Sequence, residues 1–95
     1  ETSPTLADTC AGGVDLDSIT LDLCRYVDEI LLLTETEIEG AIRLLFEQHR
    51  LVVEGSGALS VGALLKRKEH FRGKKVVAVV CGRNIDLDVL KRIIA

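Results

Sequence analysis

The sequence predicts an α/β fold, in the order helix, strand, helix, helix, strand, helix. Two short apolar runs, EILLLT (29–34) and KVVAVV (75–80), lack the polar alternation of a half-exposed strand, so each is predicted to be a strand buried on both faces. Apolar residues recur at helical spacing around these runs. Hydrophobic residues make up 47% of the chain and aromatic ones only 3%, an aliphatic composition that favours a sheet covered by helices.

The first fifteen residues, ETSPTLADTCAGGVD, are predicted to form an irregular arm, and residues 16–95 to form the α/β unit. The arm holds the only proline of the chain and the Gly12-Gly13 pair, both of which favour turns over regular structure. We therefore expect the arm to have no core of its own.

The first helix is predicted directly after the arm, with Asp17 or Ser18 able to cap its first turn. Its apolar face consists of Leu16, Ile19, Leu23 and Tyr26 or Val27. The predicted strand over 29–34 follows, and its polar stop at Thr34 begins the next helix.

The second helix carries a strong local start signal. Thr34 and Glu37 form a capping box, in which each side chain can bond a backbone N–H at the start of the helix. The helix is predicted to run to about Arg50. Its apolar face consists of Ile38, Ala41, Ile42, Leu45 and Phe46.

The stretch LVVEGSGALSVGALLKRK (51–68) has two interpretations. A dinucleotide-binding loop needs G-x-G-x-x-G followed by an acidic residue after the next strand. Gly55 and Gly57 fit the first two positions, but Ser60 occupies the third, the acidic residue is missing, and no GK[ST] of a Walker loop occurs. The motif therefore favours a helix whose small residues allow close packing, with a small nucleotide-binding domain as an alternative.

A basic connection, KRKEHFRGKK (66–75), leads to the second strand. It is interpreted as a solvated loop rather than a phosphate or nucleic-acid patch, because the net charge of the chain is −3 and only one aromatic residue interrupts the cations. After the strand over 75–80, IDLDVLKRIIA is predicted to be the final helix, with Asn84 or Asp86 as its cap.

A sheet of two strands has two open edges and little area for helices to cover. Either strands of another chain complete the sheet, which is the interpretation we favour, or these strands are part of a larger sheet. We also expect self-association into a dimer or higher oligomer. A stand-alone, self-associating interaction module is thus an alternative function.

Composition argues against several function classes. The net charge of −3 argues against a nucleic-acid partner. No leader sequence is recognised and no apolar run approaches the roughly 20 residues of a membrane span, so we expect a cytoplasmic protein without a membrane partner. Cys10, Cys24 and Cys81 form no CxxC pair and share no ligand spacing with the histidines, which argues against zinc and against a disulfide framework.

Four linked segments carry a more specific signal: TLAD, RYVDEILLLTETEI, AIRLLFEQHRLVVEGSGAL and KKVVAVVCGRNIDLD. In this order they resemble the C-terminal part of the serine/threonine dehydratases (threonine deaminases). These are fold-type II pyridoxal-phosphate enzymes, relatives of serine racemase and of the tryptophan synthase β-subunit. The resemblance covers nearly the whole chain from Thr5 onward. It implies a segment of a three-layer cofactor domain, in which 54–66 is a packed helix.

The resemblance also implies a parent activity, the pyridoxal-phosphate-dependent deamination of L-threonine or L-serine to a 2-oxo acid and ammonia. Cys81-Gly82-Arg83-Asn84 matches the family's turn beside the cofactor ring, so Cys81, Gly82 and Asn84 are implied to bind the cofactor. Cys81 would face the ring nitrogen, and its neutral side chain would leave that nitrogen largely unprotonated, which suits β-elimination.

Two acidic residues are further candidates near the cofactor. Glu54 is a cofactor-binding candidate because it begins the small-residue helix on the cofactor side of the family's domain, although the helix dipole also explains a carboxylate there. Asp8 is either a site residue or a residue of a turn.

The chain departs from the family pattern at two positions. Arg83 replaces the second glycine of the turn and would cost about 1 kcal/mol or more in strain if the backbone there has a positive φ. Its bulk could also obstruct the pocket. Thr9 stands where the family's "ADG" has glycine.

The catalytic features of the family are missing from the sequence. The chain has no Schiff-base lysine segment, no tetraglycine phosphate loop and no acidic metal site. Its lysines lie in charged surroundings that keep them protonated, and they are Lys66, Lys68, Lys74, Lys75 and Lys91. We therefore expect no catalytic residue and no metal site. We also expect no bound pyridoxal phosphate and no activity for the chain alone.

Overall fold

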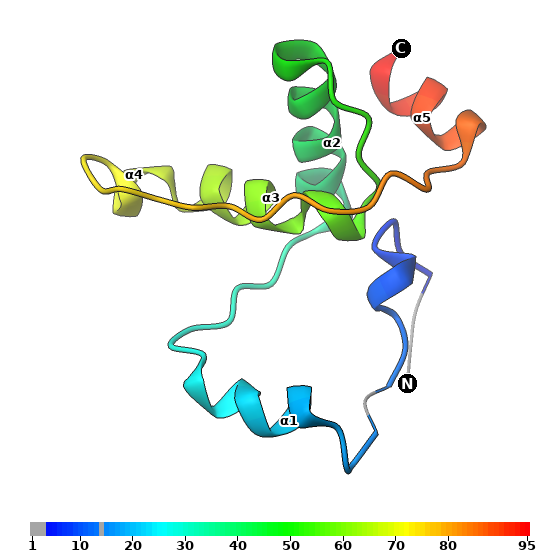
Figure 1. Cartoon of the computed structure of the whole chain (residues 1–95). Helices are drawn as coiled ribbons and strands as arrows, with labels where there is room; N and C mark the ends of the chain where they lie inside the picture. The colour runs from blue at the N-terminus through cyan, green and yellow to red at the C-terminus, as the bar shows by residue number, and fades with distance from the viewer. Residues whose placement is uncertain (1–3, 14) are drawn as a thin grey trace.

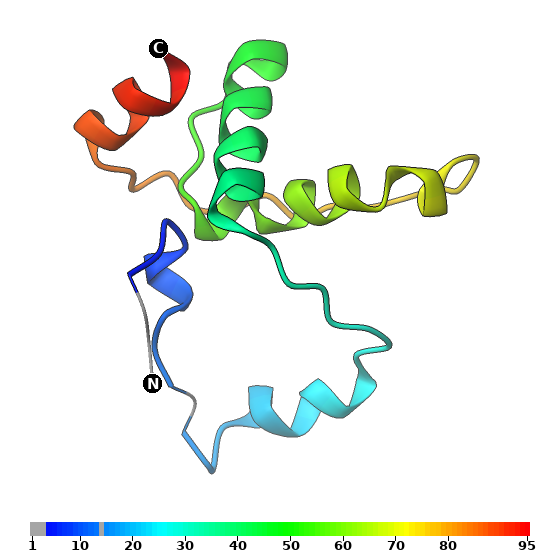
Figure 2. The same cartoon turned by 180° about the vertical axis from the view of Figure 1, so that it is seen from behind.

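The computed structural model describes residues 4–13 and 15–95 as a set of helices grouped around one central helix. The central helix is α2 (Glu35–His49), and both α3 (Leu59–Lys66) and α5 (Leu87–Ile94) pack against it. Figures 1 and 2 show this group together, with α1 (Ile19–Leu23) set apart at the end of an extended segment. The shorter elements are η1 (Asp8–Cys10), η2 (Cys24–Tyr26), η3 (Ser56–Ala58) and α4 (Lys68–Phe71).

The start of α2 is the capping box that its sequence predicts. The Thr34 hydroxyl accepts a hydrogen bond from the Glu37 N–H at 3.1 Å, and the Glu37 carboxylate accepts one from the Thr34 N–H at 2.8 Å. The helix ends at Arg50, whose φ of 55° is left-handed. The predicted bounds of this helix are confirmed. They could be predicted from the sequence since residues within the helix or next to it determine both of its ends.

The core forms where α2 meets the other segments. Ile42 and Ala41 have no exposed surface, and neither has Ala58 of η3. The final helix, α5, contributes Ile93 and is capped by Asp86, which accepts a hydrogen bond from the Asp88 N–H at 2.9 Å. Among the residues that the structure describes, the buried apolar ones are Ala7, Ile38, Ala41, Ile42, Leu45, Val53, Ala58 and Ile93. Ala7 shows that the predicted arm adds a residue to this core.

A glycine allows α3 to lie close to its neighbours. A β-carbon at Gly62 would lie 2.7 Å from Leu33 Cδ1 and 3.7 Å from the Ala41 β-carbon. The small residue therefore lets α3 approach both α2 and the segment before it, which supports the packing interpretation of the 51–68 stretch.

The predicted α/β fold class is wrong, because the described residues form helices and contain no strand. The predicted strands, 29–34 and 75–80, are irregular extended segments, and we call them the two apolar segments. A strand is defined by backbone hydrogen bonds to a neighbouring strand, and neither segment has such a neighbour within the described chain. Because the described residues contain no strand, the expectation that another chain completes a sheet is also wrong.

Side chains of α3 bond the backbone of both apolar segments instead. The Ser60 hydroxyl donates to the Val79 carbonyl at 2.5 Å, and the Lys66 ammonium donates to the Leu32 carbonyl at 2.6 Å. In Figure 1 the chain around 75–80 runs alongside α3, in agreement with the first of these bonds. The two segments are thus attached to one helix rather than to each other.

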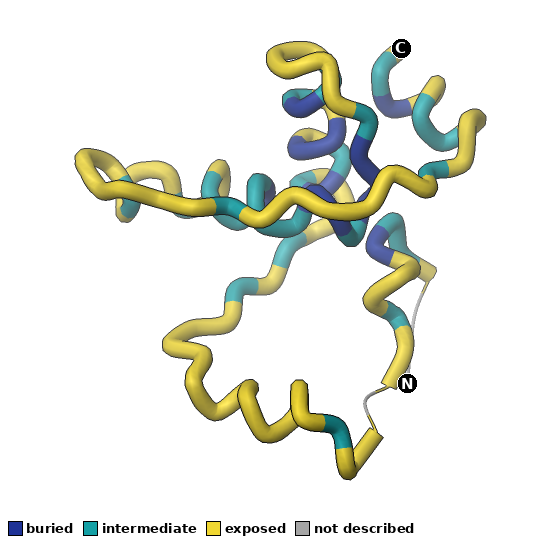
Figure 3. The backbone as a smooth tube through the Cα atoms, in the orientation of Figure 1, coloured by how far each residue is buried: buried dark blue, intermediate teal, exposed yellow. Residues whose placement is uncertain are grey.

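The apolar segments leave much of their hydrophobic surface in water (Figure 3). Ile30 and Leu32 are each 81% exposed and Val77 is 92% exposed. The radius of gyration is 14.3 Å, whereas a compact domain of this length would have about 12 Å. The chain is therefore more open than a self-contained globule.

Across the described ranges, no helix combines the length and the hydropathy that crossing a bilayer requires. The cytoplasmic location stays a prediction.

Candidate functional site

Three segments distant in sequence meet at the start of η3. The arm passes Gly55 so closely that a β-carbon there would overlap the Leu6 carbonyl and lie 2.9 Å from the Ala7 nitrogen. A β-carbon at Gly57 would overlap the Cys81 carbonyl. The two glycines of the apparent nucleotide-binding motif thus face main-chain carbonyls of the protein itself, an arrangement that supports close packing rather than a phosphate cradle.

Glu54 lies at the centre of this meeting point and is only 8% exposed. Its carboxylate accepts a hydrogen bond from the Thr9 hydroxyl at 2.7 Å and a longer one from the Asn84 N–H at 3.4 Å. Its backbone N–H donates to the Gly82 carbonyl at 3.1 Å. One residue therefore joins the arm, the start of η3 and the turn at 81–84.

The turn itself requires glycine at position 82. Gly82 has a φ of 87°, a conformation that side chains with a β-carbon adopt only with strain. A β-carbon there would also overlap the Glu54 carboxylate oxygen and lie 2.9 Å from its carboxyl carbon. Arg83 has no such constraint, since the only positive φ outside glycine in the described chain is at Arg50. The strain considered for Arg83 therefore does not arise.

Two hollows flank the turn. The first has a volume of about 110 Å³ and is lined by Glu54 and Asn84 together with Asp8 and Asp86. The second has a volume of about 200 Å³. Its lining consists of Cys81, Gly82, Arg83, Leu51, Val52, Val53 and Val80.

The structure brings the predicted site residues together around this turn. Glu54 bonds both Gly82 and Asn84, while Cys81 is a free, exposed thiol on the side of the second hollow. Asp8 begins η1 and lines the first hollow. No grouping of histidine, cysteine and acidic side chains within 4–13 and 15–95 has the makeup of a metal site.

Sequence reasoning missed two residues that hold the arm in place. Thr9 was noted only as a departure from a glycine, whereas its hydroxyl contacts Glu54. Glu35 lies outside the predicted apolar face of α2, and it accepts hydrogen bonds from the Leu6 N–H at 2.8 Å and from the Thr5 hydroxyl. The Leu6 N–H, followed by the Thr5 hydroxyl, lowers the pKa of Glu35 below its ordinary value. The partner of each residue is far away in the sequence, so no local pattern pointed to it.

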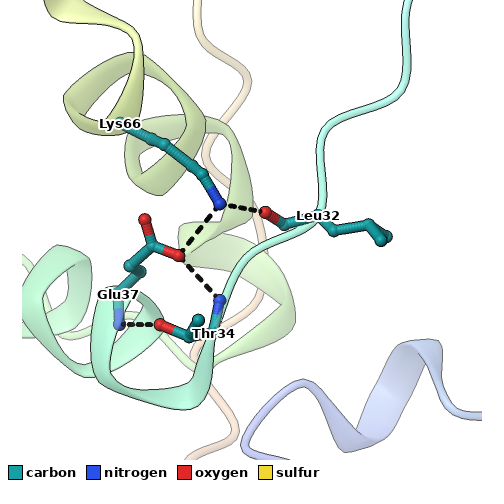
Figure 4. Close-up of polar contacts among 4 residues, drawn as sticks. All are labelled: Leu32, Thr34, Glu37 and Lys66. Carbon is teal, nitrogen blue, oxygen red and sulfur yellow. Dashed lines mark hydrogen bonds and ion pairs between the residues drawn. The ribbon is translucent and has the colours of Figure 1, made fainter.

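Three cations of the basic connection form ion pairs, and they are Lys66, Arg67 and Arg72. Lys66 lies 3.2 Å from the Glu37 carboxylate, as Figure 4 shows beside its bond to Leu32. The Thr34 N–H, followed by the hydrogen bond from Lys66, lowers the pKa of Glu37. Arg67 pairs with Glu29 at 3.0 Å, and Arg72 pairs with Glu69 at 2.7 Å. These exposed contacts agree with a solvated connection, but Lys68–Phe71 forms the short helix α4 where a loop was predicted.

Comparison with known proteins identifies the family. Residues 1–82 match the family model described as pyridoxal-phosphate dependent enzyme. The chain belongs to the pyridoxal-phosphate-dependent enzyme family. The predicted resemblance to the serine/threonine dehydratases is confirmed, because the chain is similar to proteins named threonine dehydratase or threonine ammonia-lyase.

Three of these relatives show how much of the family's length the chain represents. It is 44% identical over 95 residues to an L-threonine ammonia-lyase of Thermotoga maritima, an alignment that covers 99% of this chain and 23% of the relative. A putative threonine dehydratase of Sinorhizobium fredii is 37% identical over 91 residues, with 94% and 27% covered. A catabolic L-threonine dehydratase of Escherichia coli is 36% identical over 91 residues, with 90% and 28% covered. The chain thus spans about a quarter of the length of these members of the pyridoxal-phosphate-dependent enzyme family.

Proposed function

We propose that the chain is the C-terminal segment of the catalytic unit of a pyridoxal-phosphate-dependent ammonia-lyase acting on L-threonine or L-serine. The observation that carries this proposal is that Glu54 is hydrogen-bonded to Gly82 and Asn84 of the 81–84 turn. The chain that contains this arrangement belongs to the pyridoxal-phosphate-dependent enzyme family. The names of the three relatives support L-threonine as the substrate.

The residues around the turn fit one wall of a cofactor site. The second hollow is lined mainly by aliphatic side chains, and Cys81 and Gly82 also line it. An apolar surface with a few polar groups is typical of sites for flat organic cofactors. Pyridoxal phosphate, when bound, supplies an electron sink for bond cleavage next to an amino group.

Cys81 and Gly82 would line the ring side of this site, and Asn84, which lines the first hollow, would contribute from the other end of the same turn. A neutral thiol at the ring nitrogen would not hold a proton there, as a carboxylate would. Glu54 would support the turn from behind rather than touch the ring, because its carboxylate is bonded to Thr9 and to the Asn84 backbone.

We propose further that this segment is inactive without the rest of a catalytic unit. No lysine lines either hollow within the described chain, so neither offers an amine to a carbonyl cofactor. The Lys66 ammonium donates a hydrogen bond to the Leu32 carbonyl and forms an ion pair with Glu37. We therefore expect the isolated chain to bind no pyridoxal phosphate.

A chimera tests the proposed function. The corresponding 95-residue segment of the Thermotoga maritima ammonia-lyase is replaced by this chain, and 2-oxobutanoate formation from L-threonine is measured with added pyridoxal phosphate. The proposal predicts that the chimera is active and that the isolated chain is not. The unmodified relative is the positive control.

Two results would contradict this account. Formation of 2-oxobutanoate by the pure isolated chain would refute its inactivity. A chimera that folds and binds the cofactor but leaves L-threonine and L-serine unchanged would refute the substrate class.

A second candidate function is self-association, which the exposed side chains of the two apolar segments favour. Burying apolar surface gains about 25 cal/mol per Å² removed from water, so large exposed side chains such as Val77 and Ile30 favour a protein partner. We propose that copies of the isolated chain cover this surface for one another. Light scattering over a range of concentrations tests this, and a monomer at every concentration would contradict it.

A further inference from the structure

The buried carboxylate of Glu54 has an unusual set of partners. Within the described chain, no cation forms an ion pair with it, and its two side-chain hydrogen bonds come from the Thr9 hydroxyl and the Asn84 N–H. A buried polar group needs hydrogen bonds to compensate for lost hydration. The orientation of this carboxylate therefore depends on very few groups.

Of these two hydrogen bonds, the one from Thr9 is the stronger by geometry. The distance of 2.7 Å between the Thr9 hydroxyl and the carboxylate is the usual length for a hydroxyl donor. The distance of 3.4 Å from the Asn84 nitrogen lies beyond the usual range for an amide donor. Thr9 thus determines the direction of the carboxylate more than Asn84 does.

The direction of the carboxylate in turn determines the space left for the turn. One Glu54 oxygen occupies the volume into which a β-carbon at Gly82 would project, and the same oxygen receives the Asn84 N–H. If the carboxylate rotated, it would lose the Asn84 N–H and change its contact with the Gly82 α-carbon.

We propose that Thr9 is a positioning residue that acts through Glu54 to hold the 81–84 turn in its observed shape. A glycine, the residue expected here from the resemblance, has no hydroxyl to donate, so this bond is a property of the present chain. The inference rests on the proposed function only where it calls the turn a wall of the cofactor site.

The test uses the full chain without cofactor and three variants. Thr9→Val keeps the shape of the side chain and removes the hydroxyl, Thr9→Ser keeps the hydroxyl, and Thr20→Val is a matched control on α1. The readout is amide hydrogen exchange, followed residue by residue by NMR, at Asn84 in the turn and at Ile42 in the core.

The proposal predicts that Thr9→Val speeds exchange of the Asn84 amide by about tenfold, the scale of one hydrogen bond. Exchange at Ile42 stays unchanged, because Thr9 is exposed and lies outside the core. In Thr9→Ser and Thr20→Val, the Asn84 amide exchanges at the same rate as in the parent chain. An Asn84 amide that is unaffected by Thr9→Val, or affected equally by Thr9→Ser, overturns the proposal.

A second measurement separates this inference from the proposed function. The same substitutions are placed in the chimera, and the absorbance and emission spectra of its bound pyridoxal phosphate are recorded. A spectral change with Thr9→Val that Thr9→Ser does not produce supports both proposals. Faster Asn84 exchange with an unchanged cofactor spectrum leaves the positioning role standing and overturns the placement of the turn beside the cofactor.

Discussion

The main chain at Gly57 packs against the carbonyl group of Cys81, with no room for a β-carbon between them. A β-carbon at this position would also lie 2.9 Å from Val53 Cγ1. This contact brings the start of η3 against the residue that the proposed function places beside the cofactor ring.

Substitution of Gly57 by alanine is therefore predicted to separate η3 from the 81–84 turn and to destabilise the chain. The obstacle is a backbone carbonyl, which cannot move aside as a flexible side chain can. The matched control is Gly40→Ala, since nothing lies near a β-carbon there and alanine favours the helix interior by about 1 kcal/mol. Urea unfolding followed by circular dichroism should show a lower free energy of unfolding for Gly57→Ala and a higher one for Gly40→Ala. Equal changes in the two variants would contradict the packing described.

The capping box of α2 gives a second prediction. Thr34→Ala removes the hydroxyl that accepts the Glu37 N–H, and the loss of such a cap costs about 0.5–2 kcal/mol of unfolding free energy. Thr34→Ser keeps the oxygen and is the control. If Thr34→Ala unfolded at the same urea concentration as the parent chain, the cap would not contribute to stability.

Acid should weaken the attachment of the arm to α2. The pKa of Glu35 is lowered by the Leu6 N–H and the Thr5 hydroxyl, so folding favours its charged form. The charged Glu35 side chain therefore adds to the free energy of unfolding above the ordinary glutamate pKa of about 4.3. This added stability is lost as the pH falls through the lower pKa of the folded chain. The parent chain should be more stable than Glu35→Gln near neutral pH, and this difference in stability should shrink as the pH is lowered into the acid range below the ordinary glutamate pKa. Thermal unfolding at neutral and at acid pH checks this, and a difference that is independent of pH would contradict it.

The two apolar segments give a prediction about association. Replacing Ile30 or Val77 by lysine places a charge on a side chain that is at least 81% exposed, so the stability of the monomer should change by no more than about 0.5 kcal/mol. Self-association should weaken, because the charge would have to be buried between copies. Gln48→Lys on α2 adds the same charge away from both segments and should leave association unchanged. Light scattering distinguishes the variants, and equal association by all three would exclude the apolar segments as the interface.

Local signals in the sequence predicted the helices well. The bounds of α2 follow from Thr34, Glu37 and the apolar face, all within one segment, and Asp86 caps α5 as one of the two residues considered for that role. The two strands could not be predicted from local signals in the same way, because a strand forms only where a second strand, distant in the sequence, lies beside it. The Val79 and Leu32 carbonyls bond side chains of α3 instead.

The candidate site was predicted only in part for the same reason. The resemblance pointed to Cys81, Gly82, Asn84 and Glu54. The contact between Thr9 and Glu54 spans 45 residues, and neither residue carries a pattern that indicates the other. Their proximity follows from the packing of Gly55 against the arm, which only the three-dimensional structure makes visible.

The most direct test of the central claim uses Cys81 in the chimera. The claim is that the Cys81 side chain lies at the ring nitrogen of the cofactor as a neutral group. Formation of 2-oxobutanoate from L-threonine is compared for the chimera and for its Cys81→Ser and Cys81→Asp variants, with cofactor binding verified in each. The account predicts that serine keeps most of the activity, whereas aspartate retains the cofactor but loses the activity because it holds a proton on the ring nitrogen. Equal activity of the serine and aspartate variants would contradict it.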